Sequence, residues 1–312
     1  MAASTNDRVG SVRVRRRRWW LPVSLILPAG LALGSWWLTE PLTDRGAPPG
    51  WVPPPPVLEE VATPEPGERS PVWPEGRTAG VRAKTVALEV LLAAAARLSR
   101  VEDYTATFRK QERIKGKLGP VQTLEMKVRH KPFAIYFKFL SPKDGSEVVY
   151  AEGHHDNKLI AHSSGVARFL VPRLAVPPDH PLALADSRHP VTEAGLANLT
   201  AKLIRFRRLD LNDPEAETVL DRTRDADGRE WLRSVHTHPN HHPERPFARV
   251  EVLYDPESFF PMDIRSYDWP PPGHTGDLLL AEHYHYENLN LDAALTAQDF
   301  DPANPAYAFH RY

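Results

Sequence analysis

Apolar and polar residues alternate with two different periods along most of the chain. Soon after residue 80, apolar side chains recur every three to four positions, as in Leu88, Leu91 and Leu98, which predicts an amphipathic helix. The period then changes to two, and Tyr104 and Phe108 alternate with polar residues. This second pattern is typical of half-buried antiparallel strands.

The strand pattern recurs until close to the C-terminus and predicts about nine strands in all. A proline-broken stretch around residues 171–190 interrupts it. A second amphipathic helix follows, with Leu199 and Leu203 on one face and Thr192 as its expected N-cap. Residues 81–312 are therefore expected to form one α+β domain with an antiparallel sheet and two principal helices.

The N-terminal part of the chain has a different character. Residues 1–18 end in an arginine block, and residues 19–38 form an uncharged, largely apolar run with tryptophan pairs at both ends. About 20 such residues match the thickness of a bilayer, and the arginines place the N-terminus in the cytoplasm. We predict a single-pass anchor in a bacterial inner membrane and a periplasmic body. The alternative is a signal peptide cleaved near residues 32–34, which also exports the body.

The composition of the chain predicts a linker and excludes several kinds of binding site. Residues 39–80 are rich in proline and predict an extended linker. The net charge of −1 argues against nucleic acid as a partner. The chain contains no cysteine, which excludes disulfides, thiolate metal sites and a lipid-modified N-terminal cysteine.

The residues that could bind a metal ion are clustered histidines. His236 and His238 are spaced to share one face of a strand, and His283 and His285 repeat this spacing. If the two strands were neighbours in register, the four imidazoles would form a zinc site and favour a metal-dependent enzyme. We interpret the stretch HTHPNHHPER instead as a strand end followed by a solvated hairpin loop with exposed imidazoles, and expect no metal and no cofactor. Nucleotide-binding and nucleophile-elbow motifs are absent from the sequence, so we expect no catalytic residues.

Four stretches carry a resemblance to a known family: DYTATFRKQERIKGKLGPVQTLEMKVRHKPFAIYFKFLSP, SRHPVTEAGLANLTAKLI, YDPESFFPMDIRSYDWP and YHYENLNLDAALTAQDFDPANPAYAF. The chain between about residues 86 and 312 resembles the bacterial family called domain of unknown function 1571. That family is distantly similar to LolA-type periplasmic lipoprotein carriers. The resemblance implies a strongly curved sheet, an incomplete β-barrel, whose concave side holds acyl chains under helical cover.

With such a fold, the inward-facing side chains of the first sheet half become candidates for a cavity lining. The expected lining consists of Tyr104, Phe108, Met126, Phe137 and Phe139. We predict a non-enzymatic, membrane-tethered exported protein that binds a lipid or the acyl chains of a lipoprotein. In the alternative, the same side chains fill a closed core, and the protein is a structural or interaction module of the cell envelope.

Overall fold

The computed structural model describes residues 71–164, 173–270 and 276–309. All of them belong to one compact unit. The predicted anchor at residues 19–38 lies outside the described residues. Among those that are described, no helix is both long enough and apolar enough to cross a membrane.

In the described part of the chain, thirteen strands form one antiparallel sheet in the order β1-β9-β10-β11-β12-β13-β2-β4-β5-β6-β7-β8, with β3 attached to β2. The strands are β1 Thr78–Ala79, β2 Asp103–Ile114, β3 Lys117–Leu118, β4 Gln122–Arg129, β5 Ala134–Ser141, β6 Glu147–Ala151, β7 Leu159–His162, β8 Leu174–Val176, β9 Glu217–Arg224, β10 Glu230–Thr237, β11 Arg249–Tyr254, β12 Pro261–Asp268 and β13 Leu279–Asn290. The helices are α1 Val81–Leu98 and α2 Leu196–Asn212, with short 3-10 turns at η2 His155–Asn157, η4 Val191–Glu193 and η5 Ala297–Phe300.

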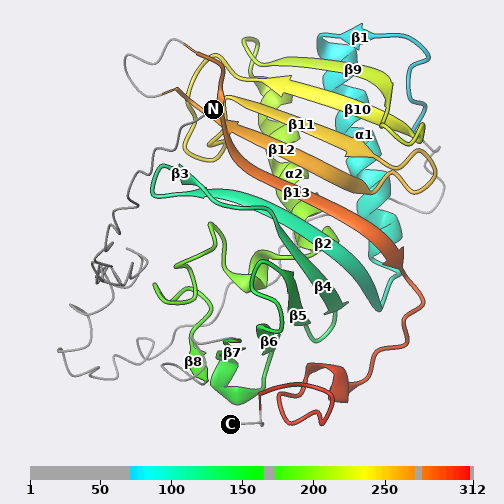
Figure 1. The fold of residues 1–312 in the computed structure, drawn as a ribbon. Helices are drawn as coiled ribbons and strands as arrows, with labels where there is room; N and C mark the ends of the chain where they lie inside the picture. The colour runs from blue at the N-terminus through cyan, green and yellow to red at the C-terminus, as the bar shows by residue number, and fades with distance from the viewer. Residues whose placement is uncertain (1–70, 165–172, 271–275, 310–312) are drawn as a thin grey trace, which may run out of the picture. The chain divides into compact units, whose positions relative to one another are not determined.

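The sheet is not closed, because its end strands β1 and β8 do not pair with each other. Both helices lie side by side on one face, which we call the inner face (Figure 1). The predicted α+β class, an open curved antiparallel sheet with two principal helices, is confirmed. The expected strand number was too low: β1, β3 and β8 are only two or three residues long, and β9 has adjacent rather than alternating apolar residues.

Helix α1 begins at Val81, where the apolar periodicity predicted a helix. Its alanine-rich buried face allows close packing against α2 and β9. The buried Lys84 extends along this face and donates a hydrogen bond from Nζ to the carbonyl oxygen of Asp213 at 2.7 Å. Because Asp213 is the C-cap of α2, this bond fixes the end of one helix against the start of the other.

Helix α2 starts later than predicted, with Gly195 rather than Thr192 as its N-cap. Thr192 lies in η4 and is not a cap of α2. The buried hydroxyl of Tyr104 accepts the first helical N–H, that of Leu196, at 2.8 Å. Gly195 has a φ of +98°, and a Cβ there would lie 3.1 Å from that hydroxyl. The position therefore favours glycine for two reasons, a left-handed backbone and a close approach.

The chain after β13 returns to the opposite, outer face of β5 and β6, as the red segment in Figure 1 shows. We call residues 291–309 the C-terminal strap. The Tyr307 ring stacks on Tyr136 of β5 at 4.1 Å between centroids, and Lys127 pairs with Asp299 at 2.7 Å. A second apolar cluster results, formed by Ala134, Tyr136, Val149, Ala151, Ile160, Phe300, Tyr307 and Phe309.

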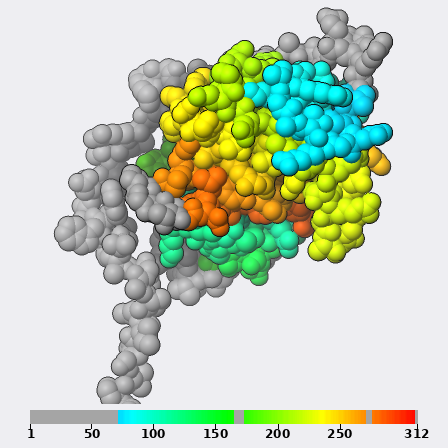
Figure 2. All heavy atoms as spheres, turned by 90° about the horizontal axis from the view of Figure 1, so that it is seen from above, coloured from blue at the N-terminus to red at the C-terminus, as the bar shows by residue number. Residues whose placement is uncertain are grey.

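The described fold also includes residues before the first helix. Trp73 is buried and donates its indole N–H to the carbonyl oxygen of Asp221 at 3.1 Å. Strand β1 pairs with β9, so segments about 140 positions apart in sequence lie side by side, as the cyan and yellow-green atoms show in Figure 2. The last residues of the proline-rich stretch therefore pack against the sheet.

Candidate functional site

The inner face of the sheet changes from apolar to charged along neighbouring strands. On β2, Phe108 is followed on the same face by Lys110 and Glu112. Across the ladder on β4, Leu124 opposes Phe108 and Gln122 opposes Lys110. Since successive residues of a strand point to opposite faces, a spacing of two keeps all these side chains on the covered side.

A cavity of about 300 Å³ lies between this inner face, α2 and the chain that connects β8 to α2. Its volume is at the lower end of the range for small-molecule sites, roughly 300–1,000 Å³. One part of the wall is apolar and is formed by Phe108, Leu124, Phe137, Phe139, Val148, Leu159, Ala161, Leu199, Leu203 and Phe206. The other part carries charged side chains.

Residues 177–195, which we call the cover segment, cross the charged end of the cavity. Lys110 donates to the hydroxyl of Ser187 at 3.2 Å and to the carbonyl oxygen of Asp186 at 3.4 Å. Arg188 donates to the carbonyl oxygen of Arg113 at 3.0 Å. Polar contacts from the sheet therefore hold the cover segment in place.

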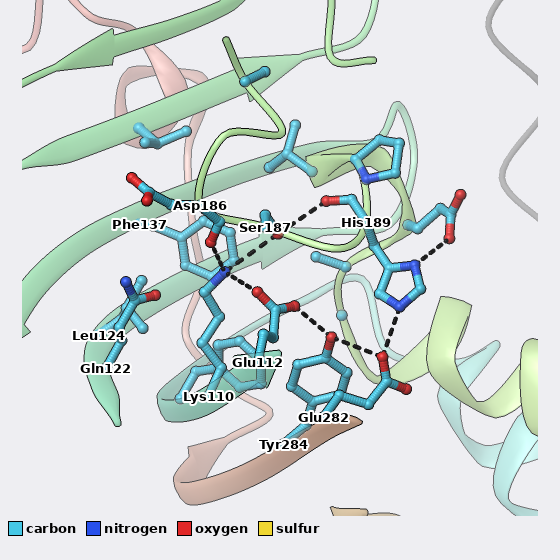
Figure 3. A pocket seen from close by; sticks show the side chains of 18 of the residues that line it. Lys110, Glu112, Gln122, Leu124, Phe137, Asp186, Ser187, His189, Glu282 and Tyr284 are labelled. Atoms are coloured by element: carbon cyan, nitrogen blue, oxygen red, sulfur yellow. Dashed lines mark hydrogen bonds and ion pairs between the residues drawn. The ribbon is translucent and has the colours of Figure 1, made fainter. Parts of the chain in front are cut away.

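Two buried carboxylates face each other at the charged end (Figure 3). Glu112 and Glu282 are direct cross-strand partners on β2 and β13, and both are about 95% buried. Like charges at directly opposed positions destabilise a sheet unless other groups compensate. Lys110 pairs with Glu112 at 2.9 Å, and the Tyr284 hydroxyl donates to Glu112 at 2.5 Å. The second carboxylate needs a separate partner.

His189 of the cover segment is that partner. Its Nε2 lies 2.8 Å from Glu282, and its Nδ1 lies 3.5 Å from Glu193. Burial opposes the charged ring, but hydrogen bonds to Glu193 and Glu282 outweigh it and raise the pKa of His189. Burial likewise raises the pKa of Glu282, but the contact with His189 reverses this, and the carboxyl keeps a lowered pKa. The pair therefore favours an imidazolium and a carboxylate.

The predicted lining residues occupy two different places. Phe108, Phe137 and Phe139 lie in the cavity wall. Tyr104 and Met126 are fully buried in the main core, and neither is among the residues that line the cavity. Tyr104 instead holds the start of α2, as described above.

The four candidate metal-binding histidines do not converge. His236 lies on β10 and His238 directly follows that strand, whereas His283 and His285 lie on β13, and β11 and β12 separate the two strands. His283 and His285 contact Asp263 at 2.8 and 2.9 Å. Within the described residues, no group of three or more His, Cys, Asp or Glu side chains is placed to hold a metal ion.

His236 and His238 lie at the end of β10 and directly after it, as expected, and both are fully buried. Beyond them the loop is solvated as predicted, with Asn240, His241 and Glu244 exposed. His236 contacts the hydroxyls of Thr218 and Ser234 at 3.0 and 2.8 Å. Burial first, and then the nearby Arg207, lower the pKa of His236 well below its ordinary value, so the ring is neutral.

A buried ion cluster on α2 explains the position of these histidines. Asp210 accepts hydrogen bonds from Arg245 at 2.8 Å and from His238 at 3.1 Å. Arg207 lies 3.1 Å from the same carboxylate. Burial alone would raise the pKa of Asp210, but Arg207 and His238 hold it well below its usual range. His236 and His238, which the sequence suggested as metal ligands, therefore belong to a buried network of charged and polar side chains.

One feature of the sequence could have predicted the charged end of the cavity, namely charged residues at the inward-facing positions of a strand. Lys110 and Glu112 continue the buried alternation of Tyr104 and Phe108. Charged residues at the buried positions of a strand are rare unless they are paired. This interruption, together with Glu282 at the matching position of β13, was the pattern that sequence reasoning missed.

Comparison with known families agrees with this architecture. A family model described as Protein of unknown function (DUF1571) matches residues 101–309. The chain belongs to this family. The match covers all strands from β2 onward together with α2, and therefore includes the whole cavity wall. Among curated proteins, no match was found.

Solved structures are similar to this member of the family in fold. A LolA superfamily protein from Nitrosomonas europaea is 10% identical, with 69% of this chain and 97% of that chain covered and a TM-score of 0.31. The Mycobacterium tuberculosis lipoprotein LppX is 10% identical, with 65% and 93% covered and a TM-score of 0.38. A DUF1329 family protein from Desulfovibrio piger is 11% identical, with 70% and 97% covered and a TM-score of 0.35. These similarities concern the fold alone, as the resemblance to LolA-type proteins implied, and at these scores they carry no argument about function.

Proposed function

We propose that the protein is a non-enzymatic, membrane-tethered exported protein that binds a lipid or an acylated protein through an acyl chain in the inner-face cavity. The observation that carries this proposal is the cavity itself, about 300 Å³ with a largely apolar wall. A single water molecule needs only about 10–15 Å³ of such space. A closed core would not leave a volume of this size, so the structural-module alternative is less well supported.

The apolar wall favours an alkyl chain as the occupant. Leu124 and Phe137 on the sheet face Leu203 and Phe206 on α2 across the cavity. Burying apolar surface is favourable by about 25 cal/mol for each Å² removed from water. An acyl chain gains this energy over its whole length without a need for polar partners. Tethering by residues 19–38 would keep the cavity close to the membrane from which such chains come.

Photoaffinity labelling of the full-length chain in lipid nanodiscs tests this function. A diazirine-bearing dodecanoyl probe is added, irradiated and mapped by peptide mass spectrometry. We expect labels on peptides from β4, β5 and α2. Ala161, a half-buried residue of β7 in the cavity wall, supplies a blocking variant, Ala161→Trp, which places an indole in the empty volume.

A matched control is available on the neighbouring strand. Ala175 of β8 is exposed and does not line the cavity. Ala175→Trp adds the same indole next to β7 but away from the cavity. We expect Ala161→Trp to lose labelling of β4 and β5 while Ala175→Trp keeps it. Labelling that is equal in both variants, or absent from the unmodified chain, would contradict the proposal.

A further inference from the structure

The polar side chains at the charged end of the cavity indicate which kind of headgroup a bound lipid can have. This inference rests on the proposed function. Along β2 and β4 the wall passes from Phe108 and Leu124 to Lys110, Glu112 and Gln122. Figure 3 shows Lys110, Glu112 and Gln122 at this polar end. A cavity that is apolar at one end and polar at the other matches an amphiphile. The chain lies on the apolar wall and the headgroup reaches the polar one.

The amide of Gln122 points to the kind of group that enters. Gln122 is 91% buried and lines the cavity, but in the described part of the chain its side chain forms no hydrogen bond. Its amide nitrogen and oxygen are not among the fully buried side-chain atoms that lack a partner, so both are accessible to a group that enters the cavity. An amide offers both a donor and an acceptor, so its natural complement is a hydroxyl or another amide.

The charges around Gln122 are already balanced. Lys110 pairs with Glu112 at 2.9 Å, and His189 pairs with Glu282 at 2.8 Å. The other charged groups in the described lining are also paired, Lys143 with Asp186 and Lys202 with Glu193. An anionic headgroup would therefore find no uncompensated cation, and it would lie beside two buried carboxylates. Burying such a charge without a partner is strongly unfavourable.

We propose that the cavity selects single-chain amphiphiles with an uncharged, hydroxyl- or amide-bearing headgroup, of which a monoacylglycerol is the simplest example. Gln122 contacts the headgroup, and the paired charges exclude free fatty acids, alkyl phosphates and alkylamines. The volume of about 300 Å³ suits one chain.

Competition in the photoaffinity assay tests the selectivity with the full-length chain in nanodiscs. The probe is a diazirine-bearing monododecanoylglycerol. The unlabelled competitors are monododecanoylglycerol, dodecanoate, dodecyl phosphate and dodecylamine, which share one chain length. Each midpoint is measured for the unmodified protein and for Gln122→Leu. Because partition into the bilayer is the same for both proteins, the ratio of their midpoints reports the cavity alone.

We expect Gln122→Leu to raise the monododecanoylglycerol midpoint about five- to tenfold, the size of one net hydrogen bond, and to change the others less than twofold. Thr123→Val, on the next residue of β4 and facing away from the cavity, should change none. Gln122→Glu adds a carboxylate and should shift the preference toward dodecylamine.

Three results would overturn this selectivity. They are an equal effect of Gln122→Leu on all four competitors, a charged competitor that depends on Gln122, and an unchanged preference in Gln122→Glu. In each of these the acyl-chain function would still stand. Absence of labelling in the cavity of the unmodified chain would overturn the proposed function as well.

Discussion

The buried ion cluster on α2 makes a quantitative prediction about stability. In Asp210→Asn the shape of the side chain is kept and its negative charge is lost. The guanidinium group of Arg207, which is 1% exposed, would then remain in the core without a counter-charge, whereas Arg245 would keep its ion pair with Asp213. Removing one partner from a buried ion pair typically costs about 3–5 kcal/mol, because the remaining charge stays desolvated.

Urea unfolding followed by far-UV circular dichroism measures this cost. Residues 52–312 are a suitable fragment, because this compact unit contains every described core residue. A loss of about 3–5 kcal/mol corresponds to a fall in Tm of about 6–20 °C for a domain of this size. The slope of free energy against urea should stay unchanged if only the folded state is affected.

A surface pair of the same chemistry supplies the control. Asp221 pairs with Arg233 at 2.6 Å, but these side chains are 21% and 36% exposed. Asp221→Asn should therefore cost no more than about 1 kcal/mol. If Asp210→Asn cost no more than Asp221→Asn, the buried cluster would not stabilise the fold through its charges, and the reasoning would be refuted.

Two further predictions concern the cavity and the start of α2. His189 has a folded-state pKa above the ordinary value of 6.5, so its stabilising contribution is fully present below about pH 6.5 and is lost as the pH rises through the folded-state pKa. The difference in free energy of unfolding between the unmodified protein and His189→Gln should therefore shrink from pH 6 to pH 9, and a constant difference would contradict this. Gly195→Ala should cost about 1–3 kcal/mol through its left-handed backbone and the close Tyr104 hydroxyl. Gly228→Ala should cost less, because nothing lies within 4 Å of its Cβ, and equal losses in thermal melts would argue against crowding.

The alternation of apolar residues was sufficient to predict the fold class, because burial on one face of a strand leaves a period of two in the sequence. It predicted α1 and the principal strands of the sheet. It could not predict β9, in which Val219 and Leu220 are adjacent, or the start of α2. That start depends on a hydroxyl 92 positions away on β2, which no local pattern records.

Part of the site was predictable for the same reason. Phe108, Phe137 and Phe139 follow from the inward-facing pattern, and all three line the cavity. The polar end was not predicted, because it depends on which strands are neighbours. Glu112 and Glu282 are 170 positions apart in sequence, and they become neighbours only because β13 pairs with β2. Charge pairing across such a separation is a property of the topology.

The C-terminal strap also decides when the chain can finish folding. Its main-chain N–H at Ala308 donates to Glu147 at 2.7 Å, a contact across 161 positions. During synthesis β5 and β6 are made before the strap that covers them, and domains fold from the N-terminal side first. The apolar outer faces of β5 and β6 therefore stay exposed to water until the strap has been synthesised. A chain truncated before the strap would therefore expose the aromatic surface of Tyr136 on β5, which Tyr307 covers in the folded protein.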